Sequence, residues 1–174
     1  MARDSRSIDT EWMALPCVCA NVRRLARLTT RFYDEALRDC GMEIGQFGLT
    51  ATIARLGEAT QVQLARGLAM DTTSLTRTLA VMNKRGWIEK RIGGDRRSRV
   101  FAVTARGRAQ LARARPAWLQ AQERVVAAIG ATQTRQLERA VEAASLAVSR
   151  QIAPAPSTLT ARRAAQRTSK RLAK

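Results

Sequence analysis

The spacing of apolar residues along the chain predicts a mainly helical protein. Between residues 17 and 40 the apolar side chains recur at helical intervals, at Val18, Val22, Leu25, Phe32 and Ala36, and Gly41 ends this segment. A second helix is predicted over about residues 43–56, with one apolar face formed by Leu49, Ile53 and Leu56. The first third of the chain is therefore expected to be two helices joined by a short turn.

Two shorter helices are predicted next. Thr60 and Gln63 have the spacing of a capping box, and the helix that they begin is expected to bury Val62, Leu64 and Leu68. Asp71 is placed to cap a further helix. The inner face of that helix is expected to carry Leu75, Leu79 and Met82, and its outer face Thr73, Arg77, Ala80 and Lys84.

A basic β-hairpin is predicted directly after this helix. Two segments, 88–92 and 100–104, have the composition of strands, and the turn between them contains Arg96, Arg97 and Arg99. A helix pair followed by a basic hairpin is typical of a winged helix-turn-helix. The expected fold class is therefore mainly α with a small β-hairpin wing (α+β).

Helices are predicted again beyond the hairpin, over about 105–129 and 132–151. Pro116 is expected to bend or break the first of them, because proline removes a helical hydrogen bond. A winged motif is small, and these helices exceed what it needs for cover. We therefore expect the N- and C-terminal helices, about 16–41 and 105–152, to form a dimerisation layer, with packing inside one chain as the alternative.

The domain organisation follows from these elements. A single domain is expected over 16–152, with the winged helix-turn-helix at about 43–104, preceded by a flexible N-terminus at 1–15. Residues 153–157 read as a linker, and residues 157–174 carry six basic and no acidic side chains. We expect 153–174 to be a basic, disordered tail that adds non-specific affinity for a polyanion.

The charge of the chain points to a polyanionic partner. It contains 31 Lys and Arg against 14 Asp and Glu, a formal net charge of +17. The excess is concentrated on the winged motif, since residues 77–113 hold eleven Lys and Arg and two acids, Glu89 and Asp95. Double-stranded DNA is the expected partner.

The side chains of the motif suit contacts with DNA. The short hydroxyls and the alanine on the outer face of the predicted helix allow close approach to base-pair edges, and Arg77 and Lys84 suit phosphates or guanine. The hairpin loop suits a minor groove, where Asp95 would orient a neighbouring arginine. The alternative is an ordinary solvated helix face.

Several other classes of function are disfavoured by the composition. The chain contains no histidine, which removes histidine-based catalysis and makes a metal site improbable, and no cofactor motif is present. Three cysteines, no export signal and no apolar run of membrane-spanning length favour a cytoplasmic protein that does not enter membranes. We expect no enzyme, with a cysteine nucleophile as the one candidate.

The sequence resembles the MarR family of bacterial transcription regulators from about Cys17 to Gln151. The resemblance is carried by Gln46-Phe47, by the run 71–76, by Gly86-Trp87-Ile88, and by Asp95-x-Arg97 leading into Val103-Thr104-x-x-Gly107. It implies a homodimer, triangular in outline, whose terminal helices interlock and whose winged lobes bind palindromic DNA.

The resemblance also implies roles for individual residues. The major groove would be read by Thr72, Thr73, Ser74, Thr76 and Arg77. In the wing, Arg97 would enter the minor groove, held by Asp95, and Arg96 and Arg99 would support phosphate contacts. Many members are repressors released by a small aromatic or lipophilic effector that binds between the dimer layer and the winged lobe.

Two alternatives to a ligand-released repressor stay open at this stage. One branch of the family senses organic hydroperoxides through a cysteine early in the first helix. Matching on Tyr33 places Cys19 at that position, with Cys17 nearby, although Arg23 stands where that branch carries a tyrosine. Against this, Cys17, Cys19 and Cys40 could simply be small buried residues. The other alternative is an architectural protein that coats DNA without sequence preference.

Overall fold

The computed structural model describes residues 17–94 and 98–152. The chain divides into two compact units, Met1–Arg124 and Val125–Lys174, and one helix runs through the boundary. The predicted residues Asp95, Arg96 and Arg97, the N-terminal segment 1–15 and the tail 153–174 lie outside the described residues.

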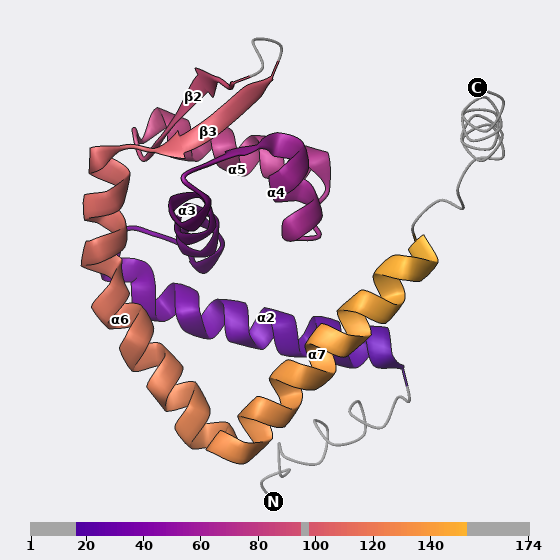
Figure 1. The fold of residues 1–174 in the computed structure, drawn as a ribbon. Helices are drawn as coiled ribbons and strands as arrows, with labels where there is room; N and C mark the ends of the chain where they lie inside the picture. The colour runs from indigo at the N-terminus through magenta and orange to yellow at the C-terminus, as the bar shows by residue number, and fades with distance from the viewer. Residues whose placement is uncertain (1–16, 95–97, 153–174) are drawn as a thin grey trace, which may run out of the picture. The chain divides into compact units, whose positions relative to one another are not determined.

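The first unit begins with helices and contains the winged motif (Figure 1). Its elements in chain order are α2 (Val18–Leu37), the 3-10 turn η1 (Arg38–Cys40), α3 (Ile44–Leu56), β1 (Glu58–Thr60), α4 (Gln61–Gly67), α5 (Thr72–Lys84), β2 (Ile88–Ile92), β3 (Arg99–Val103) and the larger part of α6 (Ala105–Ile129). The mainly helical fold class with a small hairpin is confirmed.

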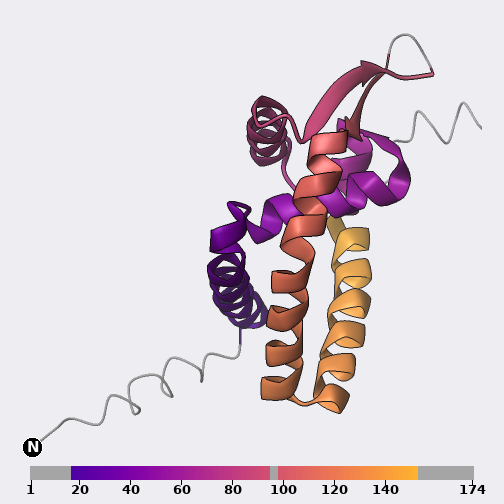
Figure 2. The same ribbon diagram turned by 90° about the vertical axis from the view of Figure 1, so that its left-hand side faces the viewer.

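The strands form one antiparallel sheet in the order β1-β3-β2. The predicted hairpin is its larger part, with Ile88 opposite Val103 and Ile92 opposite Arg99. The third strand, β1, was not predicted; it places Ala59 opposite Phe101 on the other edge of β3. Figure 2 shows the hairpin projecting from the end of the unit at which α6 begins.

The core of the unit is formed where α3, α4 and α5 meet the sheet. Its fully buried side chains are Leu37, Leu49, Ile53, Leu64, Leu75, Met82 and Ile88. Phe47 of α3 stacks on Trp118 of α6, with 5.4 Å between ring centroids. This packing supplies a fixed base for α5, since burial of several large apolar side chains is the main stabilising contribution to such a motif.

The predicted helix caps are confirmed. The hydroxyl of Thr60 accepts from the backbone N–H of Gln63, whose side-chain Oε1 accepts from the Thr60 N–H at 2.8 Å. The carboxylate of Asp71 accepts from the N–H of Ser74 at 2.9 Å. These bonds satisfy donors that a helix leaves unpaired in its first turn.

Two predictions about packing were wrong. Val62, expected in the core, is 62% exposed, because it lies two residues and therefore about 200° from the buried Leu64 around the helix. Leu56 is exposed at the last residue of α3. At Pro116 the predicted break is excluded, since α6 runs continuously from Ala105 to Ile129, and the predicted bend stays a prediction. Ala112, one turn earlier, is exposed, so water can reach the carbonyl that proline leaves without a donor.

The second unit contains the end of α6 and helix α7 (Ala131–Ile152). The turn between them is at Gly130, with φ +93°, and the hydroxyl of Thr134 donates to the Gly130 carbonyl at 2.9 Å. Most side chains of α7 are exposed, and the large apolar ones among them are Val141, Leu146, Val148 and Ile152. In the described ranges no helix is long and apolar enough to cross a membrane.

Candidate nucleic-acid interface

Helix α5 separates an inner from an outer face as predicted. Leu75, Leu79 and Met82 are buried. The predicted contact residues on the outer face are all exposed, namely Thr72, Thr73, Ser74, Thr76, Arg77 and Lys84. The hydrogen bond from the Ser74 backbone N–H lowers the pKa of Asp71, so this capping carboxylate is ionised at neutral pH. The side chains on the outer face of α5 are therefore not needed for core packing and are accessible to a partner.

A side-chain bond joins the two helices of the motif. The amide of Gln61, at the start of α4, donates to the hydroxyl of Thr76 at 2.6 Å. That hydroxyl in turn donates to the Thr72 carbonyl at 2.6 Å. Thr76 therefore buttresses the helix pair with its hydroxyl, while Thr73 makes no side-chain hydrogen bond to another described residue and stays available to a ligand.

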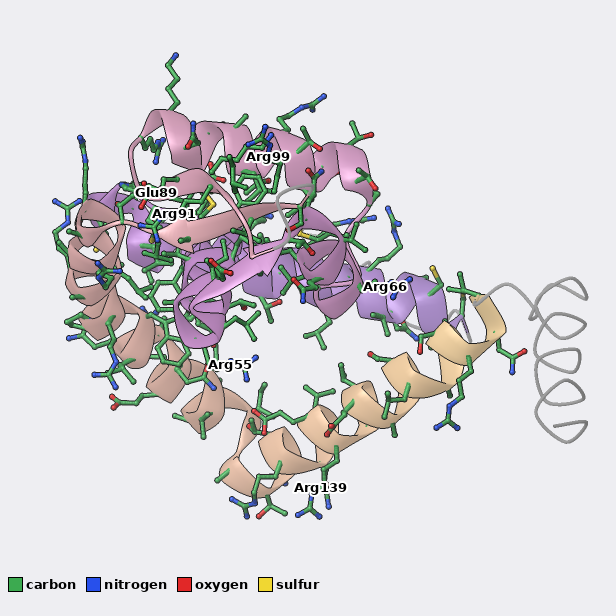
Figure 3. All side chains as sticks on the ribbon, turned by 45° about the horizontal axis from the view of Figure 1, so that its top comes forward. Arg55, Arg66, Glu89, Arg91, Arg99 and Arg139 are labelled. Atoms are coloured by element: carbon green, nitrogen blue, oxygen red, sulfur yellow. The ribbon has the colours of Figure 1, made fainter. Side chains whose placement is uncertain are left out.

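The hairpin carries basic side chains on the strands that lead to its tip. Arg99 begins β3 opposite Ile92 and is exposed. On β2 the carboxylate of Glu89 is paired with Arg91, and Figure 3 shows these two labelled side chains close together. The remaining predicted wing residues, Asp95, Arg96 and Arg97, fall in the undescribed tip.

The sequence interpretation missed Lys90 and Gln61. Both line an open groove of about 200 Å³ beside α5, the second or recognition helix of the helix-turn-helix, together with Thr76, Leu79, Ala80, Asn83 and Phe101. Lys90 lies opposite Phe101 in the sheet register, and both residues line the groove together with side chains of α5. The position of Lys90 could have been predicted from the sequence. Side chains alternate between the two faces of a strand, so Lys90 lies on the same face of β2 as the buried Ile88.

The end of α5 is joined closely to the start of α6. The hydroxyl of Thr104 donates to the Gly86 carbonyl at 2.6 Å and accepts from the Gly107 N–H at 3.0 Å. A Cβ on Gly107 would overlap the Trp87 carbonyl and come within 2.9 Å of Val103 Cγ1. Glycine at 107 thus allows the backbone of α6 to lie directly against Trp87.

The candidate redox cysteines lie near the start of α2. Cys17 and Cys19 are exposed and Cys40 is partly buried, so the alternative that all three are buried is wrong for the first two. No group of three or more potential metal ligands occurs in the described part of the chain. Further along α2, Tyr33 donates a hydrogen bond to Gln122 of α6, and burial raises the pKa of its phenol.

Comparison with known proteins assigns the family. A sequence profile described as the MarR family matches residues 41–98. The transcriptional regulator MosR of M. tuberculosis, solved in complex with DNA, is 35% identical to this chain, and the match covers 75% of this chain and 98% of MosR with a TM-score of 0.65. The chain belongs to the MarR family.

Other relatives agree with this assignment to the MarR family. A mutant of MarR from E. coli, solved with operator DNA, shares the fold at 21% identity and a TM-score of 0.65, with 71% of this chain and 89% of that chain covered. An uncharacterised HTH-type transcriptional regulator of Bacillus subtilis, YwoH, is 25% identical over 83 residues. That match covers 48% of this chain and 61% of YwoH, less than two thirds of its length. The MarR family consists of transcriptional regulators, which agrees with the expectation that the chain is not an enzyme.

Proposed function

We propose that this MarR-family protein is a homodimeric transcriptional repressor that binds a palindromic operator in double-stranded DNA. The observation that carries the proposal is the exposed outer face of α5 beside a basic hairpin on a rigid core. Such a helix fits the major groove, and the hairpin then lies over the neighbouring minor groove. Its relative MosR was solved in complex with DNA, which supports the same partner here.

The charges of the described residues support this partner. Arg77, Lys84, Lys90 and Arg99 lie on α5 or the hairpin, and none of them forms an ion pair with a described acidic side chain. Unpaired cations grouped on one motif favour phosphate contacts. In this proposal Thr72, Thr73, Ser74, Thr76 and Arg77 contact bases, and Thr76 does so with its methyl group, since its hydroxyl is bonded to Gln61 and Thr72. Arg96, Arg97 and Arg99 bind in or beside the minor groove, and Asp95 orients Arg97.

A dimer is supported by apolar side chains that the single chain leaves exposed. On α2 these include Val18, which is 76% exposed, and Val22, and on α7 they include Val141 and Ile152. Apolar helix faces of this length are normally covered by another surface. We propose that a second copy covers them, and that a small aromatic or lipophilic effector binds between the dimer layer and the winged lobe and releases the DNA.

Quantitative DNA binding tests the proposal. The duplex flanking the protein's own gene and a random duplex of equal length are titrated across a salt series. A sequence-specific regulator retains its preference for one duplex at every salt concentration, whereas an architectural protein loses affinity for both equally. If Arg97→Ala leaves operator affinity unchanged at matched salt, the role assigned to the wing is wrong.

Thiol-based sensing is a second candidate, favoured by the exposure of Cys17 and Cys19. An organic hydroperoxide would oxidise the Cys19 thiolate to a sulfenic acid and leave as the alcohol. This candidate predicts that peroxide releases the operator, that a thiol reductant restores binding, and that Cys19→Ser abolishes both effects. Release that persists in Cys19→Ser would exclude Cys19 as the sensor.

A further inference from the structure

The turn between α2 and α3 is held by side chains from two distant helices. Nη1 of Arg85, the C-cap residue that follows α5, donates to the carbonyl of Gly41 at 2.8 Å. From α6, Nε2 of Gln110 donates to the carbonyl of Cys40 at 2.6 Å, and the guanidinium of Arg113 donates to the same carbonyl. Three donors, two of them cationic, therefore converge on two consecutive carbonyls.

This arrangement has a clear electrostatic basis. The last carbonyls of a helix have no intrahelical donor and carry partial negative charge. The 3-10 turn η1 prolongs α2, and Gly41 leaves it in the left-handed region at φ +66°. Guanidinium groups suit such acceptors, because a cation near a helix C-terminus is stabilising and its hydrogen bonds are charge-assisted.

Arg85 is itself fixed in place. Its backbone N–H donates to Val81 at 3.0 Å, and its guanidinium lies 4.8 Å from the centroid of the buried Trp87 ring. The backbone N–H of Trp87 donates to the Met82 carbonyl at 3.0 Å, which fixes the Trp87 backbone just after α5. A side chain that lies over an aromatic face and is hydrogen-bonded at its tip has few alternative conformations. Arg85 can therefore hold the end of α5 in a fixed position relative to Gly41.

We propose that Arg85 is a positioning residue that fixes the recognition helix relative to α2, and thereby sets the separation of the two recognition helices in the dimer. The inference rests on the proposed homodimeric DNA binding. It assigns Arg85 to geometry within the protein and not to a phosphate contact, although it lies one residue beyond Lys84. Arg113 holds the same turn from the side of α6.

The expected consequence is a preference for one spacing of the two half-sites. Adding one base pair between half-sites moves them apart by about 3.4 Å and rotates one against the other. A lobe held firmly relative to α2 cannot follow that change, so the wild type binds the altered operator less tightly. A lobe whose Arg85 contact is removed adapts more easily.

The test compares Arg85→Met with the control variant Arg115→Met. In the wild type the Arg115 guanidinium is exposed and makes no hydrogen bond to another described residue. The first probe is the palindrome that the protein protects within the duplex flanking its own gene. The others are the same palindrome with one base pair inserted or removed at its centre, and a single half-site. We expect the wild type and Arg115→Met to discriminate between the spacings by about tenfold. Arg85→Met is expected to reduce this to about twofold with half-site affinity unchanged, and Arg85→Lys to keep part of the preference.

A measurement without DNA separates the inference from the proposed function. Amide hydrogen exchange over residues 38–44 should be faster in Arg85→Met than in Arg115→Met, since Gly41 loses its side-chain donor. Unchanged exchange overturns the inference, whatever the DNA result. Equal loss of affinity for every duplex, with a smaller salt dependence, also overturns it, because that result identifies Arg85 as a phosphate contact. If the wild type shows no sequence preference, the proposed function fails, and the exchange measurement still decides the role of Arg85.

Discussion

The side-chain amide of Gln61 donates to the hydroxyl of Thr76 across 2.6 Å, which joins the first helix of the winged motif to its recognition helix. The bond lies at the surface, one turn from the hydroxyls that face outward. It gives Thr76 a structural role that its neighbour Thr73 does not share. The two threonines can therefore be distinguished by experiment.

Replacement of Thr76 by valine should lower the free energy of unfolding. The change removes the acceptor for Gln61 and the donor to Thr72, at a cost of about 1 kcal/mol. Urea denaturation followed by circular dichroism measures this difference. Thr73→Val is the matched control, and we expect it to leave stability nearly unchanged while it weakens operator binding. Equal stability of the two variants would contradict the structural role of Thr76.

Asp71 should make stability depend on pH in the acid range. Its folded pKa lies below the unfolded value of 3.8, so its contribution is fully present above that value and is lost as pH falls through the folded pKa. The difference in urea midpoint between the wild type and Asp71→Ala should therefore be largest at neutral pH and smaller at a pH well below 3.8. A difference that is the same at both pH values would exclude the ionised cap as its source.

A methyl group at position 107 should severely destabilise the protein. Gly107→Ala forces its Cβ against the Trp87 carbonyl and Val103, and backbone atoms cannot move aside cheaply. We expect a loss of about 3 kcal/mol or more in thermal or urea unfolding. The control is Gly48→Ala in α3, where a Cβ meets no atom within 4 Å and helix propensity predicts a gain of about 0.5–1 kcal/mol.

Arg77→Ala should weaken operator binding in a sequence-dependent way. An arginine that contacts a guanine contributes about 1–3 kcal/mol of discrimination, so the variant should tolerate substitutions at one base pair that the wild type rejects. Lys84→Ala tests the contrast, since a phosphate contact weakens binding to all sequences and lowers the salt dependence by about one ion. The comparison needs fluorescence anisotropy on a set of single-base operator variants. Uniform loss in Arg77→Ala would reassign it to the backbone.

The elements found from the sequence were those with a strong local signal. The Asp71 cap, the buried row Leu75–Leu79–Met82 and the hairpin follow from residues a few positions apart, and all are present. Strand β1 has three residues, too few for an alternating pattern, and it pairs with β3 about forty residues later. A short strand of this kind is defined by its partner and not by its own composition.

The side-chain contacts that fix the site were not predictable for the same reason. Gln61 and Thr76 are 15 positions apart, and Arg85 and Gly41 are 44 positions apart. Local patterns placed Thr76 correctly on an exposed helix surface but could not show that Gln61 occupies its hydroxyl. Lys90 was recoverable, because its position in the strand follows from alternation.

The glycine at 107 and the proline at 116 divide helix α6 into parts with different mechanical properties. Near its start the backbone of α6 packs directly against Trp87, which follows the end of α5. Pro116 has no backbone N–H, so α6 already lacks one hydrogen bond at this position, and bending the helix there breaks no further one. A bend in α6 would therefore cost less free energy at Pro116 than at Gly107, where the packing against Trp87 would also be lost.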